Sequence, residues 1–258
     1  MQAPKVKKIE KILEIHNDQR IDNYFWLNER ENPEVLEYLN KENDYCDFMM
    51  KDTEDLQNDL YEEMKARYKK DDESLPYFFN AYWYIVRYEA GKEYPIFTRK
   101  FQNLENTEEI IINANELAEG KDFYDLGSIA VSPNNKIAAF SEDVLGRRIY
   151  TIRFKNLETG EFLTDEINNC TGKAVWTADN RYVFYIVKDK SLRAYKVFRH
   201  QLGTSTKDDV LIFHEKDDAF DVNVYKTKSL YYVFIASSSS ISDEHRFISA
   251  DTPLADFT

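Results

Sequence analysis

Glycine and proline are scarce in this sequence, with 7 and 6 copies in 258 residues. A chain so poor in both is unlike a flexible linker or a low-complexity segment. Aromatic residues instead make up 15% of the composition, and hydrophobic residues make up 43%. A chain of this length and composition can bury a sizeable core, so we expect a folded protein rather than a disordered one.

Positive charge is also in short supply, because 34 Lys and Arg stand against 47 Asp and Glu, for a net charge of −13. Nucleic-acid phosphates require clustered Lys and Arg, so we expect no nucleic-acid partner and regard basic ligands as more plausible. The acidic excess is concentrated in residues 28–73, with 16 acidic and 7 basic side chains. This region is either a pair of solvated helix faces, the simpler interpretation, or a docking surface for a cationic partner.

The sequence has only two cysteines, Cys46 and Cys170, with no CxxC motif and no neighbouring histidine. Buried, reduced thiols are the default interpretation, and they suit a reducing compartment. The N-terminal residues include lysines but no apolar run of signal-peptide length, and no later window resembles a membrane span. We therefore expect a cytoplasmic protein with no membrane partner.

The common catalytic motifs are missing. No two glycines bracket a serine as G-x-S-x-G, so there is no nucleophile elbow, and there is no P-loop, GxGxxG or HExxH motif. The four histidines are too scattered for metal-ligand spacing, and we expect each to be a surface or hydrogen-bonded structural residue. They are His16, His200, His214 and His245. We predict no catalytic, substrate-binding or metal-binding residue in this chain, and no cofactor.

Three polar runs have simple interpretations. The serines from Ser237 to Ser240 are expected to form a polar loop between strands. The acidic runs at residues 71–73 and 217–218 are expected to face water rather than bind a cation.

Residues up to about 70 have a helical pattern. Asn32 is a favourable N-cap and Pro33 suits the first helical position, while a second helix is expected to begin near Asp52–Thr53. Apolar residues then recur at helical spacing along one face of each helix. They are Val35, Leu36, Leu39, Cys46 and Met49 in the first helix, and Leu56, Leu60, Met64 and Tyr68 in the second. We predict a two-helix segment over residues 1–72.

The hydrophobic period changes to about two after residues 71–76, and aromatic and β-branched runs follow. A helical pattern returns only at residues 115–119, which is too short for a full helix. Similar polar turns begin at residues 132 and 177, 45 residues apart, with a fainter copy at residues 226–229. Tyr150 and Tyr195 keep the same spacing.

A repeat of 40–50 residues with four strands is typical of β-propeller blades. We predict a mainly β fold over residues 73–258, with four blade-like units. They lie near residues 75–112, 124–167, 170–214 and 218–258, the last of them incomplete.

Two N-terminal motifs resemble a known family. The sequence "RIDNYFWL" (residues 20–27) followed by "NPEVLEYLNKENDY" (residues 32–45) is similar to the N-terminal segment of the prolyl oligopeptidase family of serine peptidases. The resemblance is to its oligopeptidase B (protease II) branch, and it extends over essentially the whole chain in the family's order. Further motifs that carry it include "YWYIVRYEAGKEYPIFTR", "LGSIAVSPNNKIAAFSED", "GRRIYTIRFKNLETGE" and "WTADNRYVFY".

The resemblance implies a two-domain serine oligopeptidase, in which a seven-bladed propeller caps an α/β-hydrolase domain with a Ser-Asp-His triad. The family branch cleaves short peptides after Lys or Arg, and the propeller excludes folded proteins. The implied partners are short basic peptides and the hydrolase domain of the same parent chain, against which the N-terminal segment packs.

The resemblance also implies that the catalytic α/β-hydrolase domain is absent from these 258 residues, so we expect the chain alone to be inactive. Asn113 stands where the family tends to have Asp, and the serine-rich run at residues 237–240 lacks a histidine often found there. An alternative is a non-catalytic, propeller-like module that binds a peptide or protein. A gene fragment is the remaining interpretation.

Overall fold

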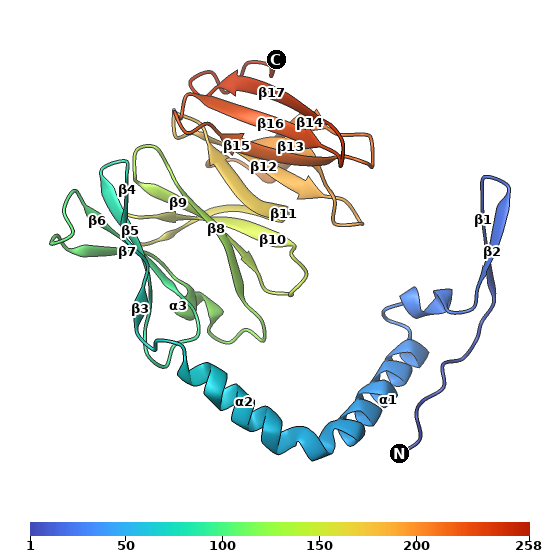
Figure 1. The fold of residues 1–258 in the computed structure, drawn as a ribbon. Helices are drawn as coiled ribbons and strands as arrows, with labels where there is room; N and C mark the ends of the chain where they lie inside the picture. Colours follow the sequence, from blue (N-terminus) through green and yellow to red (C-terminus); the bar gives the residue numbers. More distant parts are fainter. The chain divides into compact units, whose positions relative to one another are not determined.

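The computed structural model describes residues 1–258, which separate into two compact units, residues 1–69 and 70–258. The first unit contains a β-hairpin and two helices, and the second is built from antiparallel sheets (Figure 1). The chain is therefore mainly β, as the change of hydrophobic period predicts.

The first unit begins with a hairpin of β1 (Lys11–Ile15) and β2 (Asp18–Asp22). The prediction that residues up to about 70 are helical is wrong here. His16 and Asn17 have φ angles of 53° and 63°, and a two-residue turn with positive φ angles matches the twist of a hairpin. Ile12 pairs with Ile21 across the strands, a β-branched pair that favours a sheet over a helix.

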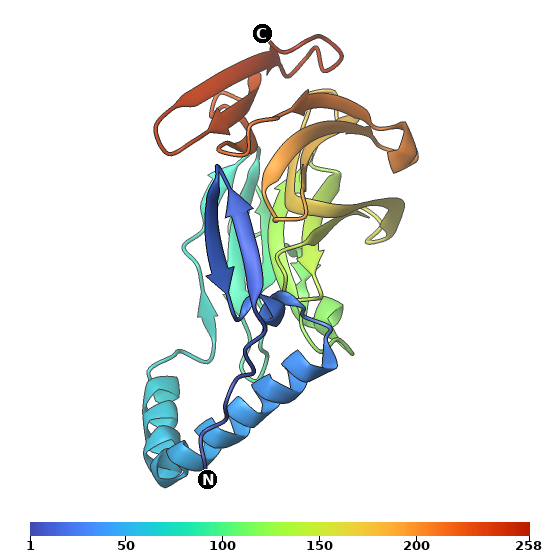
Figure 2. The ribbon, with the colours of Figure 1, turned by 90° about the vertical axis from the view of Figure 1, so that its right-hand side faces the viewer.

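The two predicted helices are present. A 3₁₀ turn, η1 (Phe25–Asn28), precedes α1 (Pro33–Met50), and η2 (Lys51–Thr53) joins α1 to α2 (Glu54–Ala66). The Asn32 side chain accepts a hydrogen bond of 2.9 Å from the Glu34 amide, which confirms its predicted role as N-cap. The helices meet at η2 in an open V (Figure 2).

The apolar faces of both helices are largely uncovered within this unit. Val35 is the buried residue of α1, and no residue of α2 is buried. The predicted apolar residues instead lie largely in solvent, with exposed fractions of 46% to 79%. They are Leu36, Leu39, Met49, Leu56, Leu60, Met64 and, just beyond α2, Tyr68. Amphipathic helices with such faces need a partner surface.

The second unit starts with a five-stranded sheet. Two short strands, β3 (Asp72–Glu73) and β4 (Tyr77–Phe79), pair with successive parts of β5 (Tyr82–Tyr88). The sheet continues through β6 (Ile96–Phe101) and β7 (Glu108–Asn113). A five-residue helix, α3 (Ala114–Ala118), follows directly, so the short helical pattern does form a single capped turn.

A seven-stranded sheet follows, in the order β14-β13-β12-β11-β10-β9-β8. Its first strands are β8 (Asp125–Val131), β9 (Ile137–Asp143) and β10 (Tyr150–Asn156), and its last are β12 (Tyr182–Lys188), β13 (Ala194–Gln201) and β14 (Val210–His214). A 3₁₀ turn, η3 (Thr206–Asp208), lies between β13 and β14.

The central strand of this sheet, β11 (Phe162–Trp176), serves two neighbours. Its first half pairs with β10 and its second half with β12, and the register shifts between Cys170 and Ala174. Asn169 and Gly172 have positive φ angles of 57° and 87° at this break. One long strand thus connects two groups of four strands, β8, β9, β10 and the first half of β11, and the second half of β11 with β12, β13 and β14. Together with the sheet of β3 to β7 and the sheet of β15 to β17, these are the four strand groups of the second unit.

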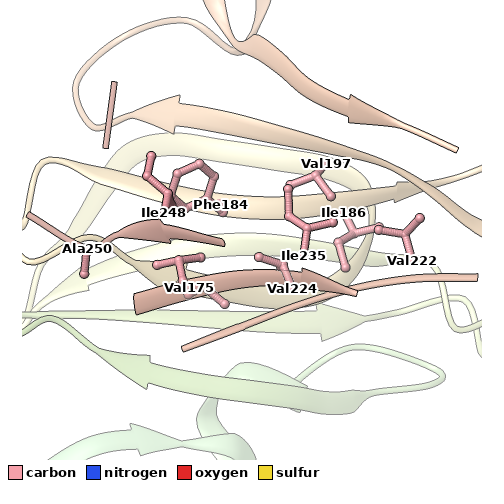
Figure 3. Close-up of a cluster of buried hydrophobic side chains, with 10 residues drawn as sticks. Val175, Phe184, Ile186, Val197, Val222, Val224, Ile235, Ile248 and Ala250 are labelled. Atoms are coloured by element: carbon pink, nitrogen blue, oxygen red, sulfur yellow. The ribbon is translucent and has the colours of Figure 1, made fainter. Parts of the chain in front are cut away.

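The last sheet contains β15 (Asp221–Lys226), β16 (Tyr232–Ser238) and β17 (Asp243–Ser249). It packs face to face on β11, β12 and β13 through buried aliphatic and aromatic side chains (Figure 3). These include Val175, Phe184, Val197, Val224 and Ile235. Two further buried clusters join the other strand groups, and the three sheets of the second unit do not close into a ring within these residues.

The repeated turns seen in the sequence have one geometry. Ser132, Thr177 and Thr227 each donate an amide hydrogen bond to the carbonyl five residues later. In each turn the third residue after these has a positive φ angle, between 61° and 67°. The spacings of 45 and 50 residues between these turns therefore mark equivalent hairpins in successive strand groups.

Candidate functional site

The inner ends of the strand groups line an open cavity of about 660 Å³. All three sheets of the second unit contribute to its wall, through β4 to β7, β8, the second half of β11, and the turn between β15 and β16. The wall is mainly apolar and aromatic, with Tyr77, Tyr84 and Trp176 among its larger side chains. This concave, apolar surface is the strongest candidate for a binding site.

The aromatic walls are fixed by neighbouring strands. The Trp176 Nε1–H donates a hydrogen bond of 2.8 Å to the Ala130 carbonyl oxygen, which joins β11 to β8. Tyr77 and Tyr84 stack with their ring centroids 5.2 Å apart. Side chains held in this way are preorganised, so little conformational entropy remains to be lost on binding.

The charged residues in the wall are Lys226, at the end of β15, and Asp251, after β17. Burial lowers the pKa of Lys226, and the negative charge of Asp251 opposes this effect. A single cation beside a single carboxylate, in an otherwise apolar wall, can orient a polar ligand. The wall contains no histidine, cysteine or paired carboxylates that would supply a nucleophile with its base.

None of the four histidines lines this cavity. His16, His214 and His245 are exposed, as the sequence predicts for surface residues. His200 on β13 is fully buried instead. It is a hydrogen-bonded structural histidine, the other predicted alternative.

The environment of His200 is the feature that the sequence does not reveal. Its Nδ1 lies 2.7 Å from Asp209 Oδ1, and its Nε2 lies 3.1 Å from Asp165 Oδ1. Burial lowers the pKa of His200, but hydrogen bonds and charge from both aspartates outweigh this effect and leave the pKa raised. The ring has no solvent access, so it cannot act on a substrate.

The cysteines have opposite environments, and both are free. Cys170 is buried as expected, and burial raises the pKa of its thiol to about 11. Cys46 on α1 is exposed, so the expectation of burial is wrong for this residue. It lies in the part of α1 whose apolar side chains are exposed.

The polar runs carry structural hydrogen bonds. Ser239 and Ser240 lie in the predicted loop between β16 and β17, whereas Ser237 and Ser238 belong to β16. Ser237 is buried and donates a hydrogen bond to Glu215. Asp71 accepts from the Ala90 amide, and Asp217 accepts from the Ala219 amide. Across the 258 residues, no three His, Cys, Asp or Glu side chains are arranged to hold a metal ion. None of the helices is long and apolar enough to cross a membrane.

The repeated four-stranded groups and the cavity at their inner ends define a β-propeller type of domain. Residues 4–258 match the family model "Prolyl oligopeptidase, N-terminal beta-propeller domain". The chain therefore belongs to the prolyl oligopeptidase family, as the sequence motifs predict.

Curated relatives carry peptidase names. Dipeptidyl aminopeptidase BI from Pseudoxanthomonas mexicana is 38% identical over 92% of this chain and 35% of its own length. Protease 2 from Moraxella lacunata is 34% identical over 99% of this chain and 38% of its own length. The chain thus spans little more than a third of these relatives.

Solved structures of oligopeptidase B are also similar to this chain. Oligopeptidase B from Leishmania major superposes with a TM-score of 0.93 at 30% identity, over 99% of this chain and 39% of that chain. Oligopeptidase B from Trypanosoma brucei, in a closed form with covalently bound antipain, gives a TM-score of 0.91 at 28% identity, over 100% of this chain and 39% of that chain. The similarity covers both the helical segment and the sheets.

Proposed function

We propose that this chain is the N-terminal and propeller part of an oligopeptidase B-like serine peptidase. The observation that carries the proposal is the similarity to oligopeptidase B over 99% of the chain. In the parent enzyme, a serine nucleophile activated by histidine would cleave the peptide bond by acyl transfer. The hydrolase domain would supply that triad.

In this proposal the four strand groups are blades of a seven-bladed propeller, and the cavity lies at its centre. A ring of blades with a narrow centre admits a short peptide and excludes a folded protein. The apolar wall with Trp176, Tyr77 and Tyr84 supports such a role, because it offers contact surface to an extended peptide without binding one defined sequence.

The helices of the first unit would cover the hydrolase domain. Their uncovered apolar faces, with Leu56, Leu60 and Met64 about half exposed, support this role. Residues 20–45 would then be a strap that holds the catalytic domain and not part of a site. Two free thiols support a cytoplasmic location for the parent protein.

The preferred substrates are proposed to be short peptides cleaved after Lys or Arg. The net charge of −13 supports this preference, because a negative surface increases the encounter rate with cationic peptides. A second candidate is removal of N-terminal dipeptides, which the name of the 38%-identical relative favours.

The test compares two chromogenic substrates on the full-length product of the gene that encodes this chain. One is an N-terminally blocked peptide ending in Arg, and the other carries the same reporter behind a free dipeptide. Cleavage of the blocked peptide supports the oligopeptidase, and cleavage of only the free dipeptide supports the second candidate. Cleavage of neither favours the non-catalytic binding module.

A matched control uses residues 1–258 alone. We expect no turnover of either substrate, because these residues hold no G-x-S-x-G motif. Turnover by this chain would overturn the assignment of catalysis to a hydrolase domain. Reading the coding sequence for G-x-S-x-G followed by Asp and His is an independent check.

A further inference from the structure

Asp165, His200 and Asp209 form a buried cluster that the proposed function does not use. Their side chains are 5%, 0% and 2% exposed. Asp165 lies in the first half of β11, which pairs with β10, whereas His200 lies on β13 and Asp209 precedes β14. The cluster therefore joins two neighbouring strand groups at the place where β11 passes from one to the other.

The hydrogen bonds determine the charge of the ring. Both ring nitrogens face carboxylate oxygens, which only accept hydrogen bonds when ionised. The Tyr185 hydroxyl also donates to Asp209, at 2.8 Å, and the Gly203 amide donates to Asp165. A neutral imidazole has one N–H and would leave one of these contacts as two facing acceptors. A ring with both nitrogens protonated satisfies every contact.

We propose that His200 is held as an imidazolium between Asp165 and Asp209, and that this buried cation is a pH-dependent lock between the β10–β11 and β12–β14 strands. Loss of a ring proton leaves one carboxylate facing a lone pair inside the protein. An unpaired buried charge is strongly unfavourable. At alkaline pH the cluster therefore stabilises the contact between the two strand groups less.

The groups around the ring come from every element packed against it. Asp165 on β11, Asp209 before β14 and Tyr185 on β12 are the titratable groups of the cluster, and Cys170 on β11 lies beside Tyr185. From β10, the uncharged ring of Phe154 stacks on His200 with a centroid distance of 6.1 Å.

The sign of the pH effect follows from these contacts. The pKa of His200 is raised above the value of about 6.5 that it would have in the unfolded chain. Its stabilising contribution is therefore complete below about pH 6.5 and is lost as the pH rises through the raised folded-state pKa.

The first test is ¹⁵N NMR of the 258-residue chain, and it needs no change at the cluster. Substituting the three exposed histidines, by H16Q, H214Q and H245Q, leaves His200 as the single imidazole signal. We expect both ring nitrogens to be protonated at pH 7.5, where an unfolded histidine is about nine-tenths neutral. One unprotonated ring nitrogen at this pH overturns the proposal.

The second test compares D165N with E166Q, each added to the variant that carries H16Q, H214Q and H245Q. Asp165 contacts the ring, whereas the neighbouring Glu166 is exposed and bonds to Asn168. Removing one carboxylate should lower the pH at which the His200 ring loses its proton by at least about one unit, because an adjacent opposite charge typically shifts a pKa by one to three units. E166Q should leave it unchanged, and equal shifts in both variants contradict the lock.

Discussion

The indole Nε1–H of Trp176 donates a 2.8 Å hydrogen bond to the Ala130 carbonyl oxygen across two strands that are not paired with each other. Trp176 belongs to the second half of β11 and Ala130 to β8, so the bond ties the inner strands of neighbouring groups. It also fixes the largest side chain in the wall of the cavity.

Replacing Trp176 with Phe should destabilise the second unit by about 1–3 kcal/mol, because the Ala130 carbonyl loses its donor in a largely buried site. Urea unfolding followed by circular dichroism measures the loss. The control is Trp83→Phe, since Trp83 donates to Gln102 at an exposed position and should cost less. Equal losses of stability would show that burial does not increase the contribution of the Trp176 hydrogen bond.

Gly172 is expected to tolerate no side chain. Its φ angle is 87°, and an added Cβ would lie 2.7 Å from Ser141 Oγ and 2.8 Å from Tyr150 Cγ. Gly172→Ala should cost about 1–3 kcal/mol for overpacking beyond the backbone strain.

The matched control for this substitution is Gly160→Ala. Gly160 has a φ angle of 78° but no atom within 4 Å of an added Cβ, so it reports backbone strain alone, about 1–2 kcal/mol. Unfolding midpoints of the two variants should differ by the packing contribution. Identical midpoints would mean that Ser141 and Tyr150 move aside freely.

The Asn32 side chain should contribute about 1 kcal/mol to the first unit as an N-cap. Asn32→Ala should lower the thermal midpoint of helix loss, measured by circular dichroism. Asn43→Ala, at an exposed position inside α1, should leave the midpoint unchanged or raise it slightly, because Ala favours a helix interior. A fall in both variants would indicate a general effect of asparagine loss.

The two thiols should react at very different rates with a thiol reagent at pH 8. Cys46 is exposed, whereas burial raises the pKa of Cys170 to about 11, so almost none of it is thiolate at this pH. We expect one rapid equivalent in the native protein and two in denaturant. Cys46→Ser should remove the rapid phase, and rapid labelling of that variant would contradict the buried position of Cys170.

The exposed helical face should be unimportant for the stability of the first unit by itself. Leu60 is 47% exposed, so Leu60→Gln should change the unfolding free energy of residues 1–258 by less than about 0.5 kcal/mol. Val35→Ala, at a position 2% exposed, should cost about 2 kcal/mol. In the full-length product, Leu60→Gln should destabilise the protein measurably if this face packs on the hydrolase domain.

Local patterns in the sequence predicted the elements that local interactions build. Asn32 and Pro33 mark the start of α1 because the N-cap bond spans only two residues. The turns at Ser132 and Thr177 repeat because each is closed by hydrogen bonds within five residues. The hairpin at residues 11–22 departs from the predicted helical segment, because the His16–Asn17 turn and the cross-strand Ile12–Ile21 pair decide its structure.

The repeat of strand groups, the two long helices and the family motifs follow from the order of neighbouring residues, and the sequence predicts them. The burial and hydrogen bonding of single side chains depend on the tertiary structure. His200 is buried because Asp165, 35 residues away, meets it across a strand junction, and Cys46 is exposed because nothing in its unit covers that part of α1. Burial depends on which distant strands meet, and no local pattern encodes that.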